Sequence, residues 1–189
     1  QVLLRGIGPS LGAFGVPNPL ADPEIELHGP SGFITRINDN WRDTQEAKIL
    51  ATGLAPTNDL ESAILADLAP GNYTAVVKGK NNTSGVGLVE VYDLGSALSE
   101  LGNISTRAFV STGTDVVIGG FILGGDDNSS ATIVIRALGP SLCNLGIPGC
   151  LADPVLELHD DNGALLAAKD NCDPSPDPFA CQGPLSCTN

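Results

Sequence analysis

Residues 2–41 read VLLRGIGPSLGAFGVPNPLADPEIELHGPSGFITRINDNW, and residues 133–172 read IVIRALGPSLCNLGIPGCLADPVLELHDDNGALLAAKDNC. The two stretches align without a gap at an offset of 131 residues, and 17 of the 40 positions are identical. Many of the other positions exchange one aliphatic side chain for another. Such self-similarity identifies a tandem repeat, so we expect both copies to fold alike.

The two copies are out of phase with the ends of the chain. Residues 46–94 continue the first copy and have no counterpart after the second. Residues 98–130 lead into the second copy and have no counterpart before the first. The sequence therefore predicts one full period plus a partial copy, cut in mid-repeat at Gln1. We expect a first module over residues 1–97 and a second over residues 98–189, which ends in a Pro- and Cys-rich tail.

Short apolar runs separated by turn residues predict strands along the whole chain. The composition fits, with 42 % hydrophobic residues, few aromatics, and 23 Gly and 14 Pro to form turns. The expected strands are Val2–Ile7, Glu24–His28, Phe33–Ile37, Ser62–Leu65, Tyr73–Lys78, Gly87–Tyr92, Ser105–Val110, Val116–Leu123, Thr132–Leu138, Val155–His159 and Ala164–Ala168. This pattern predicts an all-β chain made of antiparallel β-sandwich modules, immunoglobulin-like or jelly-roll-like.

One short helix is expected, near residues 44–52. Asp43 is placed to cap its start, and Glu46 follows three residues later, as in a capping box. Gly53 is placed to end it, because glycine readily adopts the left-handed conformation that closes a helix.

The net charge of −13 makes the surface acidic and limits the partners. That charge repels nucleic acid and anionic membrane surfaces, so neither is an expected partner. Membrane insertion is not expected either, because no apolar run reaches the roughly 18 residues that span a bilayer. Carboxylate-rich turns bind Ca²⁺ through several oxygens. The candidates are Asp39, Asp43 and Asp59 in one group and Asp126 and Asp127 in another, with ordinary turn chemistry as the simpler alternative. No other cofactor is expected.

All five cysteines fall in the last 47 residues: Cys143, Cys150, Cys172, Cys181 and Cys187. None forms a CxxC pair or has zinc-finger spacing, so we expect disulfides formed in an oxidising compartment. Cys143 and Cys150 replace Gly12 and Pro19 of the first copy and bracket a single loop, which a bridge between them would close. Cys172 replaces Trp41, so a bridge from it to Cys181 or Cys187 is a hypothesis for how the second copy is held without that aromatic ring. The odd count leaves one thiol free or paired with another molecule.

The repeated motifs R-x-x-G-P-S-L and L-A-D-P-x-x-E-L-H occur together with NDNWRDTQ at residues 38–45 and VEVYDL at residues 89–94. This combination resembles a tandem-repeat β-sandwich module of large secreted or surface proteins of environmental bacteria. The resemblance covers almost the whole chain, up to about residue 171. It implies an extracellular or cell-surface location and a structural or adhesive role, without enzymatic activity.

A hydrolase motif is present but does not predict catalysis. GPSLG at residues 8–12 matches the G-x-S-x-G pattern, which needs a helix directly after the serine. The Gly- and Pro-rich residues that follow argue against that helix, so we expect Ser10 to hydrogen bond to the local backbone. His28 and His159, the only histidines, occupy equivalent positions at strand ends, which indicates a role in the scaffold. We therefore expect no catalytic residues and no enzyme.

Arg5 and Arg136 are equivalent and lie within apolar strands. Each is expected either on the solvent face or paired with a carboxylate. Asp22 and Asp153, in the repeated LADP segment, are the expected partners. If such a pair is buried, removing one partner is costly because it leaves an unpaired charge.

Unfinished modules have unpaired strand edges, and such edges act as templates for strand addition. We therefore hypothesise that the chain polymerises head to tail into an extracellular fibre in which each subunit completes its neighbour. One alternative is that residues 98–130 complete the first module within the same chain. Another is that the chain is a module of one long linear surface protein. A carbohydrate- or ligand-binding adhesion module is the other alternative, although Trp41 is the only Trp that could stack on a sugar.

Overall fold

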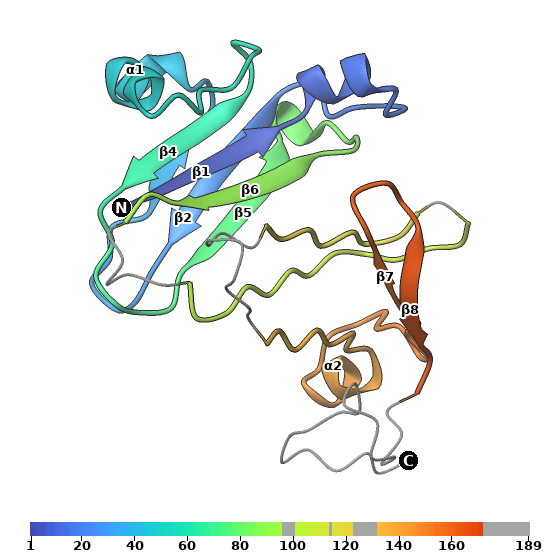
Figure 1. Ribbon diagram of the computed structural model, residues 1–189. Coiled ribbons are helices and arrows are strands. Elements are labelled where there is room, and N and C mark those ends of the chain that lie inside the picture. The colour runs from blue at the N-terminus through green and yellow to red at the C-terminus, as the bar shows by residue number, and fades with distance from the viewer. Residues whose placement is uncertain (96–100, 114, 123–131, 172–189) are drawn as a thin grey trace. The chain divides into compact units, whose positions relative to one another are not determined.

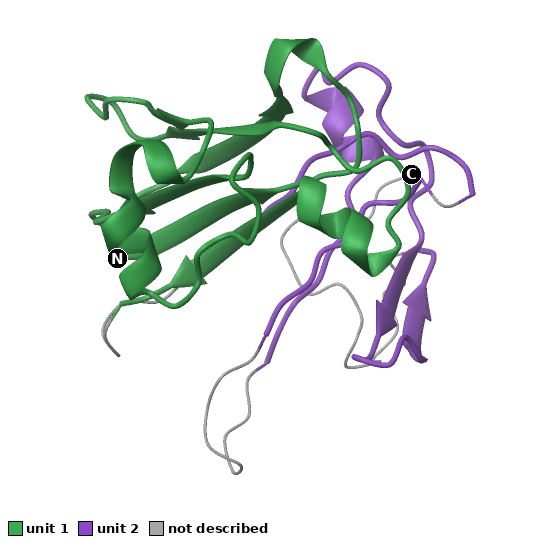
Figure 2. Cartoon of the chain, turned by 90° about the horizontal axis from the view of Figure 1, so that it is seen from above, with its two compact units in different colours: residues 1–104 green, residues 105–189 purple. Residues whose placement is uncertain are grey.

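The computed structural model describes residues 1–95, 101–113, 115–122 and 132–171 (Figure 1). In these residues the chain is mainly β, with small antiparallel sheets that do not close and few helices. The chain divides into two compact units, residues 1–104 and 105–189 (Figure 2). The module boundary expected at 97/98 lies outside the described residues. No helix in the described part is long and apolar enough to cross a membrane.

The first unit contains two three-stranded antiparallel sheets. The first sheet has the order β4-β1-β6, and the second has the order β3-β2-β5. The strands are β1 (Val2–Ile7), β2 (Pro23–His28), β3 (Arg36–Asn38), β4 (Ser62–Ala66), β5 (Thr74–Gly79) and β6 (Leu88–Asp93). Five of these six strands lie within one residue of their predicted ends. The exception is β3, which is shorter than the predicted run and starts three residues later.

The two sheets pack face to face over an aliphatic cluster. Leu4 of β1, Ile25 and Leu27 of β2, and Ile64 and Ala66 of β4 are buried in it. Ile25 and Leu27 are two residues apart, so both point to one face of β2, while the charged residues between and beside them point to the other. The period-2 pattern of the LADPEIELH segment therefore gives the second sheet one apolar face and one polar face.

The other face of the first sheet is also covered. Helix α1 (Arg42–Ala51) lies beside β4, and Ile49 and Trp41 pack there with Leu3, Ala63 and Leu65 (Figure 1). The Trp41 side chain is 1 % exposed, and its indole Nε1 donates to the carbonyl oxygen of Asn58 at 3.1 Å. β1 and β4 are thus covered on both faces of the first sheet, which explains why they are apolar at consecutive positions.

The helix itself is close to its predicted position, but its start is built differently. It begins at Arg42 after Trp41, with no side-chain cap, so the prediction that Asp43 caps it is wrong. Glu46 pairs with Arg42 one turn earlier instead of completing a capping box. The prediction for the end is confirmed, because Gly53 has φ +72° and donates its N–H to the Leu50 carbonyl at 3.0 Å.

The GPSL segments form short helical turns that were not predicted from the sequence. They are η1 (Pro9–Phe14), a 3-10 helix, and α2 (Pro140–Asn144), and a further 3-10 turn, η2 (Lys80–Asn82), follows β5. A Cβ atom added at Gly8 would lie 2.1 Å from the Leu20 carbonyl oxygen, and one at Gly139 would lie 2.1 Å from that of Leu151. Both copies therefore fold the LADP segment onto GPSL, and this crossing requires glycine.

The second unit contains a hairpin of β7 (Leu156–His159) and β8 (Leu165–Lys169), within one residue of the predicted strands. Three other predicted strands of this unit form no ladder within residues 105–113, 115–122 and 132–138, so those predictions are wrong there. A strand needs a partner for its backbone groups. In the first unit β1 lies between β4 and β6, and the described residues of the second unit include no counterpart of either.

Candidate functional site

A buried carboxylate organises the GPSL segment of the first unit. Glu61 is fully buried just before β4. Its Oε1 accepts hydrogen bonds from the backbone N–H groups of Gly8 (3.2 Å) and Ser10 (2.9 Å) and from the Ser10 hydroxyl. These donors sit at the start of η1, where backbone N–H groups have no partner within the helix. The prediction that Ser10 bonds to the local backbone is therefore wrong, and Glu61 was not predicted from the sequence.

Ser10 follows β1 and lies within the 3-10 helix η1, and its hydroxyl donates to Glu61. His28 lies elsewhere, with Nε2 3.2 Å from Glu26 Oε2 and Nδ1 3.3 Å from Thr35 Oγ1. The described residues bring no imidazole to Ser10, so the hydrogen-bonded serine and histidine of a hydrolase are not assembled within them. What Ser10 does here is hold the loop to the buried carboxylate.

The two histidines occupy matching environments in the two copies. His159 Nε2 lies 3.0 Å from Glu157 Oε2, as His28 does from Glu26. The hydrogen bond to Glu157, followed by that to the Gly163 carbonyl, raises the pKa of His159 above its usual 6.5. Each histidine thus pairs with the glutamate two residues earlier on the same face of its strand.

The polar face of the second sheet is an ion-pair ladder. Lys78 of β5 reaches Glu24 (3.0 Å) and Glu26 (2.5 Å) of β2. The hydrogen bond from Lys78, followed by that from His28, lowers the pKa of Glu26. The hydrogen bonds to Glu26 and then Glu24 raise the pKa of Lys78.

Arg5 pairs with Glu90 and not with Asp22, which corrects the predicted pairing. Its Nε donates to Glu90 Oε2 at 2.7 Å, its Nη2 to the Tyr92 hydroxyl at 2.8 Å, and its Nη1 to the Leu54 carbonyl at 2.7 Å. Arg5 and Glu90 face each other in the β1–β6 ladder. Burial, and then the hydrogen bond to Glu90, raises the pKa of Tyr92. Arg5 therefore ties β6 to β1.

In the second copy the equivalent side chains are not paired. Arg136 and Asp153 are both exposed, and no ion pair joins them in the described part of the chain. Of the two alternatives expected for Arg136, the structure has the solvent-exposed one and not the pair with Asp153. In the first copy Asp22 has a buried Oδ1 without a hydrogen-bond partner.

The acidic candidates for Ca²⁺ are engaged with the protein's own side chains. Asp39 binds Lys80, Asp59 accepts from Arg42 Nε at 2.6 Å, and Asp43 accepts from Asn40 Nδ2 at 3.2 Å. The hydrogen bond to Asp39 raises the pKa of Lys80. No group of three or more metal-ligating side chains occurs among the residues searched, which are the described ones. Asp126 and Asp127 lie outside the described residues.

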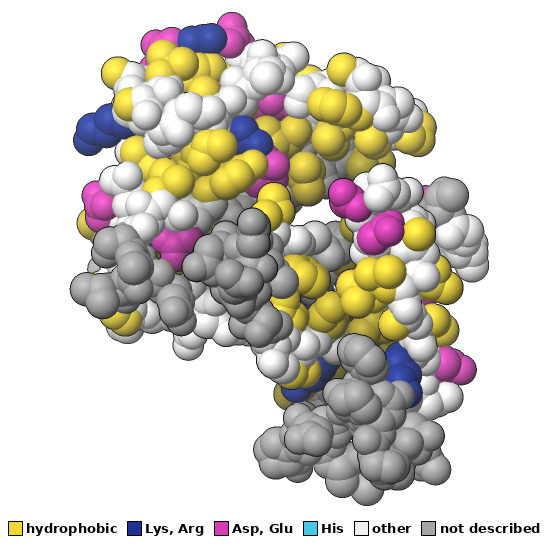
Figure 3. Space-filling model, in the orientation of Figure 1, with side chains coloured by type: hydrophobic (Ala, Val, Ile, Leu, Met, Phe, Trp, Pro, Cys, Tyr) yellow, Lys and Arg dark blue, Asp and Glu magenta, His cyan; other side chains and the backbone are white. Residues whose placement is uncertain are grey.

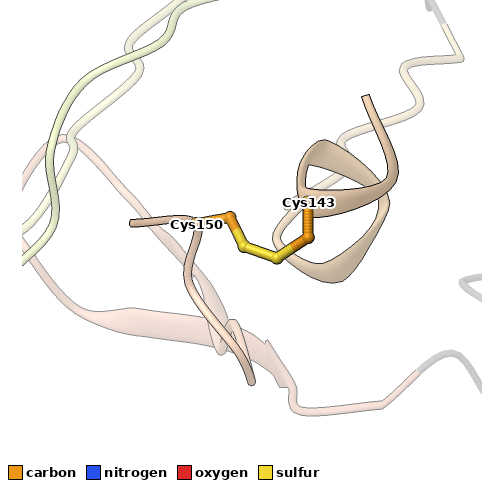
Figure 4. The surroundings of a disulfide bond; sticks show 2 residues. All are labelled: Cys143 and Cys150. Carbon is orange, nitrogen blue, oxygen red and sulfur yellow. A yellow bond between two sulfur atoms is a disulfide. The ribbon is translucent and has the colours of Figure 1, made fainter. Parts of the chain in front are cut away.

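One predicted disulfide is present. Cys143 and Cys150 are bridged, with their Cα atoms 5.6 Å apart, and the bond spans from α2 to the following loop (Figure 4). In the first copy a Cβ atom added at Gly12 would lie 3.7 Å from Pro19 Cγ. The two copies thus bring the same pair of positions together. Cys172, Cys181 and Cys187 lie outside the described residues.

The outer edge of β4 is closed by side chains. Asn38 Oδ1 accepts from the Ala63 N–H at 2.8 Å. Gln45 makes two bonds to Leu65, accepting its N–H at 3.1 Å and donating to its carbonyl at 3.0 Å. Gln45 leaves the helical conformation (φ −133°) within α1, and its side chain thereby replaces a neighbouring strand.

The second unit exposes the residues that are buried in the first. Leu3 and Leu4 of β1 are 0 % and 4 % exposed, whereas their counterparts Val134 and Ile135 are 70 % and 40 % exposed. Exposed apolar side chains also occur along residues 116–122, and hydrophobic surface is visible over the second unit in Figure 3. The counterparts of the buried strand β1 are therefore exposed in the described part of this unit.

Comparison of the chain with protein-family models, with curated proteins and with solved structures found no match. The repeat and the geometry described above are therefore what bears on function.

Proposed function

We propose that this chain is an extracellular structural protein, a subunit of a fibre or surface polymer in which neighbouring copies complete each other's β-sandwich modules by strand addition. The observation that carries the proposal is the contrast between β1 and residues 133–138. The same repeat positions are buried between two strands in the first unit and exposed in the second. Sequence equivalence with β1 favours the same buried environment for residues 133–138.

The hydrophobic effect favours covering these strands. Burying a Val, Leu or Ile side chain contributes about 1.5–3 kcal/mol. Ile133, Val134, Ile135 and Leu138 are all exposed, so a partner that covers them gains several such contributions. Exposed apolar surface of this kind marks interaction sites in proteins.

Two further observations support an extracellular polymer. The Cys143–Cys150 bridge fits an oxidising compartment. A contact between a first-copy surface and a second-copy surface joins two different surfaces, and such head-to-tail contacts extend into filaments when they do not close into a ring. Completion of each module would add the strands needed for an immunoglobulin-like or jelly-roll-like sandwich.

The alternative, an adhesion module that stacks a sugar on Trp41, is disfavoured because the Trp41 ring is buried.

The test is assembly of the purified, oxidised chain. We expect filaments by negative-stain electron microscopy and a concentration-dependent series of oligomers by sedimentation velocity. Val134→Lys should abolish both, because it places a charge on a surface that assembly covers. Leu166→Lys is the matched control, since Leu166 is also exposed in the second unit but lies on β8. A wild-type chain that stays monomeric at every concentration and forms no filaments overturns the proposal.

A further inference from the structure

The two sheets of the first unit have four edge strands, and three of them are protected. The β4 edge is occupied by the side chains of Asn38 and Gln45. The β3 strand has only three residues and begins with Arg36. The β5 strand carries Lys78, and a lysine on an edge strand discourages strand addition. The remaining edge strand is β6.

Among the described residues, no backbone hydrogen bond is found to the groups of Val89 and Val91 on the side of β6 that faces away from β1. Leu94 N–H donates to the Gln1 carbonyl at 2.8 Å, so this is a hydrogen-bonded pair of the antiparallel ladder. Because such pairs alternate, Glu90 and Tyr92 also direct their N–H and C=O groups toward β1. Val89 and Val91 then direct theirs to the outer edge. Val89 is also 43 % exposed, so this edge of β6 is not covered in the described part of the chain.

A strand added to β6 would lie beside a strand that has no buried residue and whose Leu88 and Val89 are both exposed. Leu88 and Val89 are consecutive, so their side chains point to opposite faces of the sheet. A strand that covers both should therefore be apolar at consecutive positions rather than at alternate ones. A strand added to the second sheet should instead alternate, because that sheet has the Glu24, Glu26 and Lys78 ladder on its outer face.

Residues 116–122, VVIGGFI, have this pattern and contain no charged residue. Val116, Val117 and Ile118 are consecutive and all exposed, as are Phe121 and Ile122. The other two uncovered segments of the second unit, residues 105–110 and 132–138, each contain an arginine. In the repeat, residues 116–122 precede residues 133–138, the counterpart of β1.

We propose that β6 is the acceptor edge of the assembly and that residues 116–122 of a second copy are the strand that adds to it. This inference rests on the proposed function and names its contact surface. The contact joins the first unit of one chain to the second unit of the next, so it continues head to tail.

The acceptor is tested with proline at Val89. Val89→Pro removes an N–H that points away from β1, so the β1–β6 ladder keeps its hydrogen bonds. We expect a monomer by sedimentation velocity, with the fluorescence of buried Trp41 unchanged. Ala75→Pro is the matched control. Lys80 N–H donates to the Asp22 carbonyl in the β2–β5 ladder, and by alternation the Ala75 N–H points to the outer edge of β5. Ala75→Pro should assemble like the wild type.

The donor is tested with Ile118→Asp, a change at a side chain that is 84 % exposed and therefore harmless to the isolated chain. We expect it to be monomeric alone. Val89→Pro retains a donor strand and Ile118→Asp retains an acceptor edge, so an equimolar mixture should form heterodimers that extend no further.

The outcomes separate this inference from the proposed function. If the wild type assembles and both variants also assemble, the β6 contact is wrong while the fibre proposal stands. If the wild type is monomeric, both are wrong. If Val89→Pro loses the Trp41 signal, the substitution has disturbed the first unit, and Ile118→Asp alone tests the contact. Normal assembly of Ile118→Asp would then overturn the contact, and loss of its assembly would support it.

Discussion

The hydroxyl of Ser10 donates a hydrogen bond to the carboxylate of Glu61, a fully buried side chain that lies 51 residues further along the chain. The same oxygen also accepts the N–H groups of Gly8 and Ser10. A charge buried in this way is retained only where hydrogen bonds replace its water. Glu61 therefore links the start of η1 to the start of β4.

Replacing Glu61 should destabilise the first unit. Glu61→Ala leaves the Gly8 and Ser10 donors without a partner, and each unsatisfied buried donor costs about 1–3 kcal/mol. We expect the free energy of unfolding to fall by about 2–4 kcal/mol for this reason. Glu61→Gln keeps an acceptor oxygen and should lose less. Urea unfolding followed by Trp41 fluorescence measures both. Glu46→Ala, at a half-exposed helix pair, is the control and should change little; equal losses for Glu61→Ala and Glu46→Ala would contradict this role.

Removing Arg5 should cost more than removing Arg136. Arg5 makes three hydrogen bonds, two that hold β6 to β1 and one to the Leu54 carbonyl, and its side chain is 16 % exposed. Arg5→Ala should lower the free energy of unfolding by about 2–3 kcal/mol, the range for hydrogen bonds to charged groups in a partly solvated site. Arg136→Ala should leave the monomer within about 0.5 kcal/mol of the wild type, because its side chain is exposed. Similar melting temperatures for the two variants would show that the Arg5 network is not stabilising.

The first copy should accept the disulfide of the second. Gly12 and Pro19 are equivalent to Cys143 and Cys150 and are already in proximity. The double change Gly12→Cys with Pro19→Cys closes a short loop, worth about 2.5 kcal/mol in the chain-entropy model. The melting temperature of the first unit should rise under oxidising conditions and fall back to the wild-type value after reduction. Reduction also breaks the Cys143–Cys150 bridge, so the wild type is measured under both conditions as the control. Failure of the two thiols to pair, judged by intact mass after alkylation, would contradict the equivalence.

The charge of His159 should depend on Glu157. Its folded pKa lies above 6.5 because Glu157 and the Gly163 carbonyl accept its hydrogen bonds. This pair therefore contributes stability that is fully present below pH 6.5 and is lost as the pH rises through the folded pKa. An NMR titration should give His159 a pKa above the usual value, and Glu157→Gln should shift it back. No change in the titration of His159 in that variant would contradict the pairing.

Much of the fold of the first unit could be predicted, because local patterns determine it. Apolar runs and turn residues placed five of its six strands within one residue, and Gly53 closes α1 as its sequence position indicated. The repeat also indicated the Cys143–Cys150 bridge, because the two residues replace Gly12 and Pro19 of one loop.

The contacts that depend on pairing between distant segments could not be predicted. Arg5 and Glu90 are 85 residues apart and meet only because β1 and β6 are neighbours. Glu61 resembles any loop glutamate in the sequence, and Gln45 looks like an ordinary helix residue. Their roles follow from where β4 lies. Residues 105–110 and 132–138 of the second unit have strand propensity but form no ladder, because a ladder also needs a neighbouring strand.

The close approach of Gly139 to the Leu151 carbonyl has a consequence for how fast and how tightly copies would join. It spans only 12 residues, needs nothing from β4 or β6 counterparts, and is tied by the Cys143–Cys150 bridge. Such a short-range contact forms early and at little entropic cost. In the proposed assembly the second unit would meet a partner with its loop already ordered, so less conformational entropy would be lost on association than if the whole segment had to order at that moment.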